Sequence, residues 1–98
     1  MFGKLFGNSE KVDCVALVGK GASIIDVRSA AEFASGHVPG AINIPLQDIQ
    51  NRFEEITSLE GPYVLCCASG MRSGQAERFL TSQGLEAHNA GPWTRLNQ

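Results

Sequence analysis

Hydrophobic residues occur in two kinds of pattern along the chain, short continuous runs and helical spacings. Residues 23–27 and 63–66 are apolar without alternation, which is typical of strands buried on both faces. Two weaker segments, residues 41–44 and 85–89, are predicted as further short strands. Because the predicted strands alternate with helical segments, the pattern favours an α/β domain whose parallel sheet is covered on both faces.

The helices between these strands are predicted from caps and from periodicity. A first short helix ends near Val18, with Ser9 or Asp13 as its cap. Ser29 caps the next helix, and Glu32 stands at the position that completes a capping box. Two more helices are predicted, over residues 46–58, where Leu46, Ile49, Phe53 and Ile56 have helical spacing, and over residues 73–83.

Size and composition indicate one folded domain. The chain has 98 residues, of which 43% are hydrophobic and 18% charged, a composition that argues against disorder. Residues 1–9 show no clear period and are expected to form a loosely ordered arm. Residues 10–98 are therefore expected to make up the domain.

Charge and cysteine content exclude several classes of partner. Eight basic and ten acidic side chains give a net charge of −2, and the basic ones are scattered, so we expect no nucleic-acid partner. The longest apolar run, residues 63–68, is far shorter than the ~20 residues that span a membrane, so we expect no membrane partner. Three cysteines without disulfide spacing favour a reducing cytoplasm.

The most reactive local feature is a cysteine between an apolar strand and a helix. Cys67 follows the strand directly, and the helix opens a few residues later, so its thiolate is favoured by free N–H groups and by the helix dipole. Ser69 and Gly70 permit a tight loop, and Arg72 adds a permanent positive charge. These residues predict a nucleophilic thiolate in an anion-binding cradle. The alternative is that Cys67 is a buried, inert residue of the turn.

The other candidate residues are predicted to be structural. Cys66 is expected to face the core, because neighbours on a strand point to opposite faces, and Cys14 is expected to pack on the first helix. The alternatives are a redox role for Cys66 and a resolving role for Cys14. His37 and His88 have no ligand spacing with the cysteines, so no metal site is predicted.

Charged residues near the first strand are also assigned to support. Asp26 and Arg28 are predicted to support the reactive loop from beneath, with direct contact to the substrate as the alternative. Arg28 could also pair with Glu32 four residues later. His37 is expected to fix a turn, and Trp93, near the end of the chain, is expected either to anchor that end to the core or to cover the site.

Four segments of the chain resemble one known family. The sequence I-I-D-V-R followed by E-F resembles a D-V-R…E-F signature, and G-H-V-P-G-A-I-N-I-P matches a second signature almost residue for residue. The strand and loop V-L-C-C-A-S-G-M-R-S and the close near G-P-W are similar to the family as well. In these four segments the chain resembles a single-domain rhodanese of the rhodanese homology family.

The resemblance implies a fold and a reaction. The fold would have three layers, with about five short parallel strands and helices on both faces. Cys67 would take the sulfane sulfur of thiosulfate or of a persulfide donor, release sulfite from thiosulfate, and pass the sulfur from a persulfide to cyanide or a thiol, without a cofactor. The loop that binds the substrate and the persulfide would consist of Ala68, Ser69, Gly70, Met71 and Arg72.

Loop length and composition separate the alternatives. Four residues lie between Cys67 and Arg72, whereas related phosphatases of the cell-cycle type have five, so the phosphatase or arsenate reductase alternative is disfavoured. Ala68 stands where the family often has Arg, which would weaken the affinity for an anionic donor. A second alternative remains: a persulfide carrier that accepts sulfur from a partner protein and relays it without turnover.

Overall fold

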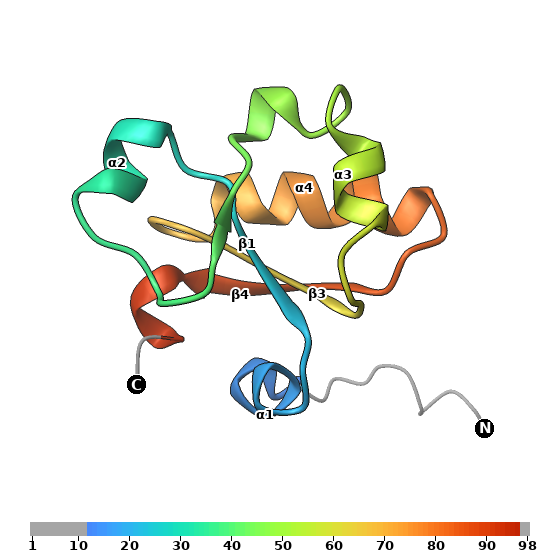
Figure 1. Ribbon diagram of the computed structural model, residues 1–98, viewed down its shortest axis with the longest axis horizontal. Helices are drawn as coiled ribbons and strands as arrows, with labels where there is room; N and C mark the ends of the chain where they lie inside the picture. The colour runs from blue at the N-terminus through green and yellow to red at the C-terminus, as the bar shows by residue number, and fades with distance from the viewer. Residues whose placement is uncertain (1–11, 97–98) are drawn as a thin grey trace.

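A four-stranded parallel sheet forms the centre of the computed structural model, which describes residues 12–96 (Figure 1). Its strand order is β2-β1-β3-β4. The expected arm over residues 1–9 lies outside the described residues. The four strands are β1 (Ser23–Asp26), β2 (Ile42–Asn43), β3 (Tyr63–Cys67) and β4 (Ala87–Pro92).

The α/β architecture is confirmed, and the expected count of about five strands is corrected to four within residues 12–96. β4 ends at Pro92, which has no N–H to donate to a sheet, and the chain then turns into the 3-10 helix η2 (Trp93–Arg95). β2 is only two residues long, and Pro45 follows it closely. The four strands of the sheet thus account for all the apolar segments that the sequence predicts as strands.

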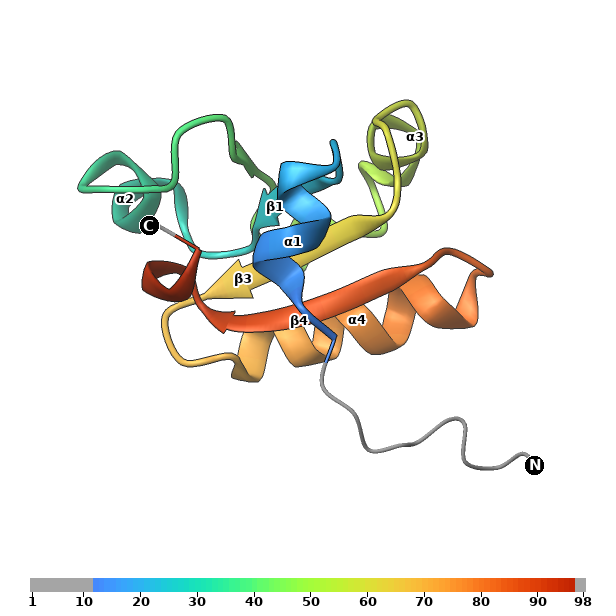
Figure 2. The same ribbon diagram turned by 90° about the horizontal axis from the view of Figure 1, so that it is seen from below.

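Helices cover both faces of the sheet, as Figures 1 and 2 show. Residues of α3 (Phe53–Thr57) and α4 (Met71–Ser82) pack on one face, in a core cluster that contains Ile25 and Leu65. Residues of α1 (Cys14–Gly19) and η2 pack on the other face with Ile24 and Val64. Each fully buried aliphatic side chain of this kind contributes about 1.5–3 kcal/mol to the free energy of unfolding.

Local capping signals are confirmed at two helices. Asp13 caps α1 by accepting a hydrogen bond from the Ala16 N–H, and the rival cap Ser9 lies outside the described residues. α2 (Ala30–Ala34) has the full capping box of Ser29 and Glu32. This helix lies beyond the carboxyl end of β1, on the side where β3 also ends (Figure 1).

The predicted continuous helix over residues 46–58 is wrong. The structure has the short 3-10 helix η1 (Leu46–Asp48), a turn, and then α3. Ile49 and Ile56 are nevertheless both buried in the same core cluster. Hydrophobic spacing indicates which side chains face the core, and here a turn keeps the same side chains inward without an unbroken helix.

No helix within residues 12–96 is both long enough and apolar enough to cross a membrane.

Candidate active site

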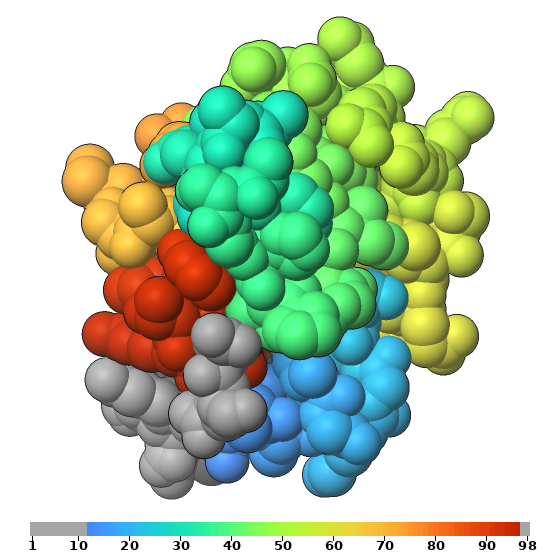
Figure 3. All heavy atoms as spheres, turned by 60° about the vertical axis from the view of Figure 1, so that its left-hand side comes forward, coloured from blue at the N-terminus to red at the C-terminus, as the bar shows by residue number. Residues whose placement is uncertain are grey.

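Cys67 is the last residue of β3, and a three-residue loop leads from it into α4. Gly70 immediately precedes the helix with φ of 104°, a conformation that favours glycine. A Cβ atom on Gly70 would lie 3.1 Å from the backbone Cα of Gly91, so the loop packs directly on β4. Figure 3 shows this part of the surface, where α2, the loop and the chain after β4 meet.

Several donors converge on the Cys67 sulfur. The Gly70 N–H donates to Sγ over 2.9 Å, and the Ser73 hydroxyl lies 3.3 Å from Sγ. Burial acts to raise the pKa of Cys67, but hydrogen bonds from the Ser73 hydroxyl and from the N–H groups of Ser73, Gly70 and Ser69 outweigh it, so the pKa is lowered. The arrangement therefore favours a thiolate, which is the nucleophilic form of cysteine.

Ser73 and Asn89 form a network that the sequence analysis missed. The buried Ser73 hydroxyl lies 2.7 Å from Oδ1 of Asn89 as well as 3.3 Å from Sγ of Cys67. It has one proton, so it donates to one acceptor at a time. Asn89 is held in place because its amide donates to the Gly70 carbonyl and its Oδ1 accepts from the Gly91 N–H.

A signal for Ser73 exists in the sequence. It precedes Ala76 and Leu80 by three and seven positions, which places a polar side chain on the buried face of α4. A hydroxyl on a buried face needs a polar partner, so it marks a candidate contact. No comparable local signal points to Asn89, which approaches the loop only through the pairing of β4 with β3.

The two adjacent cysteines lie on opposite faces of the sheet, as predicted. Cys67 belongs to the core cluster under α4, and Cys66 belongs to the cluster under α1. Burial, followed by the nearby charge of Asp26, raises the pKa of Cys66 to about 12. Cys66 is therefore a neutral core thiol, and Cys14 packs partly buried in its cluster, so both packing predictions are confirmed.

Arg72 is paired within the protein. Its Nη1 and Nη2 donate to the two carboxylate oxygens of Glu32 over 2.8 and 3.0 Å. The hydrogen bonds from Arg72 lower the pKa of Glu32 to about 2, so the pair stays ionised at neutral pH. The predicted pairing of Arg28 with the Glu32 carboxylate is wrong, because Arg28 reaches only the Glu32 carbonyl oxygen, over 3.3 Å.

Asp26 and Arg28 form a buried ion pair at the end of β1. Arg28 donates to both oxygens of Asp26, with Nη2 at 2.7 Å, and also to the carbonyl of Gly36 over 2.8 Å. Its guanidinium lies 4.7 Å from the ring centroid of Trp93. This cluster ties β1 to the middle of α2, to Gly36 just after that helix, and to η2, so it fixes the helix that holds Glu32.

His37 and Trp93 have structural contacts. The His37 ring stacks on Phe33 with centroids 3.7 Å apart, and its Nδ1 lies 2.7 Å from the Phe33 carbonyl. Trp93 packs against the core cluster under α1 and contacts the position of Gly36. These contacts agree with the turn-fixing role predicted for His37 and with the anchoring alternative for Trp93.

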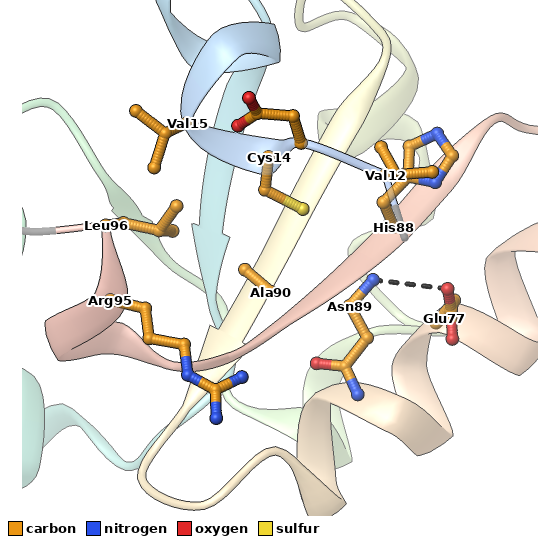
Figure 4. A pocket seen from close by; sticks show the side chains of 10 residues that line it. Val12, Cys14, Val15, Glu77, His88, Asn89, Ala90, Arg95 and Leu96 are labelled. Carbon is orange, nitrogen blue, oxygen red and sulfur yellow. Dashed lines mark hydrogen bonds between the residues drawn. The ribbon is translucent and has the colours of Figure 1, made fainter. Parts of the chain in front are cut away.

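A separate pocket of about 420 Å³ lies on the α1 side of β4 (Figure 4). Cys14, His88, Ala90 and Leu96 are among the residues around it, and Cys67 is not. Within residues 12–96 no group of three or more His, Cys, Asp or Glu side chains is arranged to hold a metal ion.

A parallel sheet with a cysteine cradled where a strand turns into a helix defines a class of protein. The family model of the rhodanese-like domain matches residues 11–91, so the chain belongs to this family. Its solved structural neighbours share the fold. The structure described as rhodanese with anions from E. coli has a TM-score of 0.68 and 33% identity, and the match covers 74% of this chain and 88% of that one.

Two curated relatives are named for sulfur chemistry. Thiosulfate sulfurtransferase PspE of Escherichia coli is 38% identical over 68% of this chain and 66% of its own length. Putative sulfur carrier protein YrkF of Bacillus subtilis is 36% identical over 65% of this chain and 34% of its own length. Across three Bacillus subtilis relatives the matched region spans only 34% to 63% of the relative's length. The relatives support membership in a sulfurtransferase family.

Proposed function

We propose that this protein is a sulfurtransferase that moves a sulfane sulfur from thiosulfate or a persulfide donor to a thiophilic acceptor through a persulfide on Cys67. The observation that supports this most directly is the set of hydrogen-bond donors that converge on the Cys67 sulfur and lower the pKa of its thiol. A thiolate held at the start of a helix is both a nucleophile and a site that stabilises added negative charge. Cys67 is the catalytic residue of this proposal.

The first half of the reaction loads the enzyme. The Cys67 thiolate attacks the outer sulfur of thiosulfate, the S–S bond of thiosulfate breaks, and sulfite leaves with the bonding electron pair. Cys67 then carries a terminal persulfide anion, and total charge is conserved. The N–H groups of the loop residues from Ser69 to Ser73 are the groups that would stabilise this anion.

The second half unloads the enzyme. Cyanide attacks the outer sulfur of the persulfide to form thiocyanate, or a thiolate attacks it to form a new persulfide, and the Cys67 thiolate is regenerated. Neither step needs a metal or an organic cofactor. Cys67 is buried, so substrates would approach it from the side of the loop, where Ala68, Ser69 and Met71 are exposed to solvent.

The proposal places the loop and its supports in defined roles. Ala68, Ser69, Gly70, Met71 and Arg72 would form the wall around the persulfide. Asp26 and Arg28 would support this loop indirectly, because Arg28 holds α2, whose Glu32 binds Arg72. A free thiolate needs a reducing environment, and all three cysteines are free in the structure. We therefore propose the cytoplasm as the working compartment.

The intact mass of the protein after incubation with thiosulfate tests the proposal. We expect the mass of one added sulfur atom on the wild type and none on Cys67→Ser, followed by loss of the added sulfur when cyanide is supplied. Absence of the adduct on the wild type after incubation with thiosulfate and, separately, with a cysteine persulfide donor would refute the sulfurtransferase proposal. Loading by a cysteine persulfide donor without repeated turnover would identify the alternative, a persulfide carrier.

A further inference from the structure

The ion pair between Arg72 and Glu32 determines how much positive charge the loop presents to a donor. Arg72 is the only basic residue of the loop from Cys67 to Ser73. Its guanidinium is held by both oxygens of Glu32, and both side chains are a little over one-third exposed. The pair is therefore electrically neutral while it lies beside the site.

Glu32 is fixed in this place by contacts of its own. Its Oε1 accepts a hydrogen bond from the Ser29 N–H over 2.9 Å, as part of the capping box of α2. Its carbonyl accepts from Arg28, which is itself locked to Asp26. The carboxylate is thus presented to Arg72 by a rigid turn, and the pairing does not depend on a mobile side chain alone.

Arg72 lies in the loop between Gly70 and Ser73, whose N–H group and hydroxyl lie 2.9 and 3.3 Å from the Cys67 sulfur. The negative charge of Cys67 is among the causes that raise the pKa of Arg72, after the hydrogen bond and the charge of Glu32. The other arginine predicted at the site, Arg28, is bound to Asp26 and buried. Both arginines that the sequence places at the site are therefore neutralised by carboxylates.

We propose that Glu32 is a specificity-determining residue that lowers the preference of the site for the thiosulfate dianion and thereby favours a persulfide donor of low net charge. This inference rests on the proposed function. The favoured donor has the form R–S–SH. The Cys67 thiolate attacks its outer sulfur and the S–S bond breaks. The leaving R–S⁻ takes the proton of the outer sulfur, so that Cys67–S–S⁻ and R–SH are formed.

The two partners of the pair must then have opposite effects on donor choice. Thiosulfate carries two negative charges, so its reaction depends strongly on the net charge of the pair. Cysteine persulfide has a net charge of zero when its outer sulfur is protonated and −1 when it is ionised, so its reaction depends on that charge less. Glu32→Gln leaves a net charge of +1, and Arg72→Gln leaves −1. If the pair only held the loop in shape, replacing either residue would change the preference between the two donors in the same direction.

The experiment measures kcat/KM for thiosulfate and for cysteine persulfide with cyanide as the acceptor, and compares their ratio among variants. We expect Glu32→Gln to raise the ratio about fivefold and Arg72→Gln to lower it by a similar factor, because one unit charge acts on a dianion in a solvent-exposed setting. The double variant should return to about the wild-type ratio. Added salt should shrink both changes.

Matched controls separate charge from structure. Gln at position 32 can still accept from the Ser29 N–H, so the cap is retained. Glu55→Gln breaks a similar two-pronged pair, between Glu55 of α3 and Arg52 just before that helix, and should leave the ratio unchanged. The ratio does not depend on the active fraction of a preparation, and Arg72→Gln gives an independent arm if Glu32→Gln folds poorly.

Two results overturn the inference in distinguishable ways. A ratio that falls or stays constant in Glu32→Gln, or that moves in the same direction in both single variants, refutes the role of Glu32 and leaves the sulfurtransferase proposal intact. A wild type that forms no Cys67 persulfide with either donor refutes the proposed function, and the inference is refuted with it.

Discussion

Two junctions between a strand and a helix lie at the same end of the sheet and are built in opposite ways. Where β1 leads into α2, the Ser29 hydroxyl accepts from the Glu32 N–H over 3.1 Å and the Glu32 carboxylate accepts from the Ser29 N–H. Where β3 leads into α4, the helix begins after Gly70 without a side-chain cap. There the Gly70 N–H donates to the sulfur of Cys67.

The difference shows how one kind of junction serves stability and another serves chemistry. The first N–H groups of a helix have no partner within the helix and need an acceptor. At α2 the chain supplies that acceptor from its own Ser and Glu side chains, so the turn is closed and stable. At α4 the acceptor is a reactive sulfur, so the same unpaired donors are directed at an atom that can change its charge.

Replacing the acceptor at the second junction should have the largest effect. We expect Cys67→Ser to abolish sulfur transfer while the circular dichroism spectrum stays unchanged, because a hydroxyl is nearly isosteric but not ionised at neutral pH. Cys66→Ser should keep most of the activity, since Cys66 packs in the opposite core cluster. Thiosulfate:cyanide turnover measures both. Equal loss in the two variants would contradict the assignment of Cys67 alone.

Distorting the uncapped turn should come next. We expect Gly70→Ala to lower turnover by about 10²-fold, the loss typical of one misplaced donor. The reason is that its Cβ would lie 3.1 Å from the Gly91 backbone at φ of 104°. Gly84→Ala is the matched control, because Gly84 has φ of 88° but open space around it. Both variants should lose some stability in thermal unfolding, and unchanged turnover in Gly70→Ala would show that the loop tolerates the displacement.

Removing one donor to the sulfur should shift the pH dependence. Ser73→Ala deletes the hydroxyl that favours the thiolate, so the pKa of Cys67 rises and the acid limb of the pH–rate profile moves to higher pH. At neutral pH we expect turnover to fall about tenfold, consistent with one hydrogen bond to a charged group. Ser82→Ala, which removes a hydroxyl bonded to the Phe79 carbonyl on the same helix, serves as the control. A profile identical to the wild type would exclude Ser73 as a determinant of the thiolate.

The smallest effect on chemistry should come from the capped junction. Ser29→Ala removes the cap of α2 and should lower the free energy of unfolding by about 1 kcal/mol. The pH–rate profile with cysteine persulfide should not change, because Ser29 donates nothing to the Cys67 sulfur. Chemical denaturation measures the first quantity. A shifted profile would mean that the two junctions are coupled more tightly than their hydrogen bonds indicate.

Features that depend on neighbouring residues were predictable from the sequence. The capping box of α2 and the opposite orientations of Cys66 and Cys67 follow from spacings of three residues and of one residue. The place of Cys67 between a strand and a helix followed from one apolar run and the helix after it. The prediction of a continuous helix over residues 46–58 was wrong, because a 3-10 helix, a turn and a short α-helix can place the same apolar residues toward the core.

Pairings between distant residues were decided only by the tertiary structure. Glu32 binds Arg72, 40 positions away, and Ser73 meets Asn89, 16 positions away. The expected ion pair between Arg28 and Glu32 does not form, because Arg28 pairs with Asp26 instead. The Asp26 carboxylate is fully buried, and a buried carboxylate needs a charged partner far more than an exposed carboxylate does. Sequence alone determined which residues stand at the ends of the strands. Packing then determined which of these residues pair with one another, because the choice of partner depends on burial and on distances that only the folded chain sets.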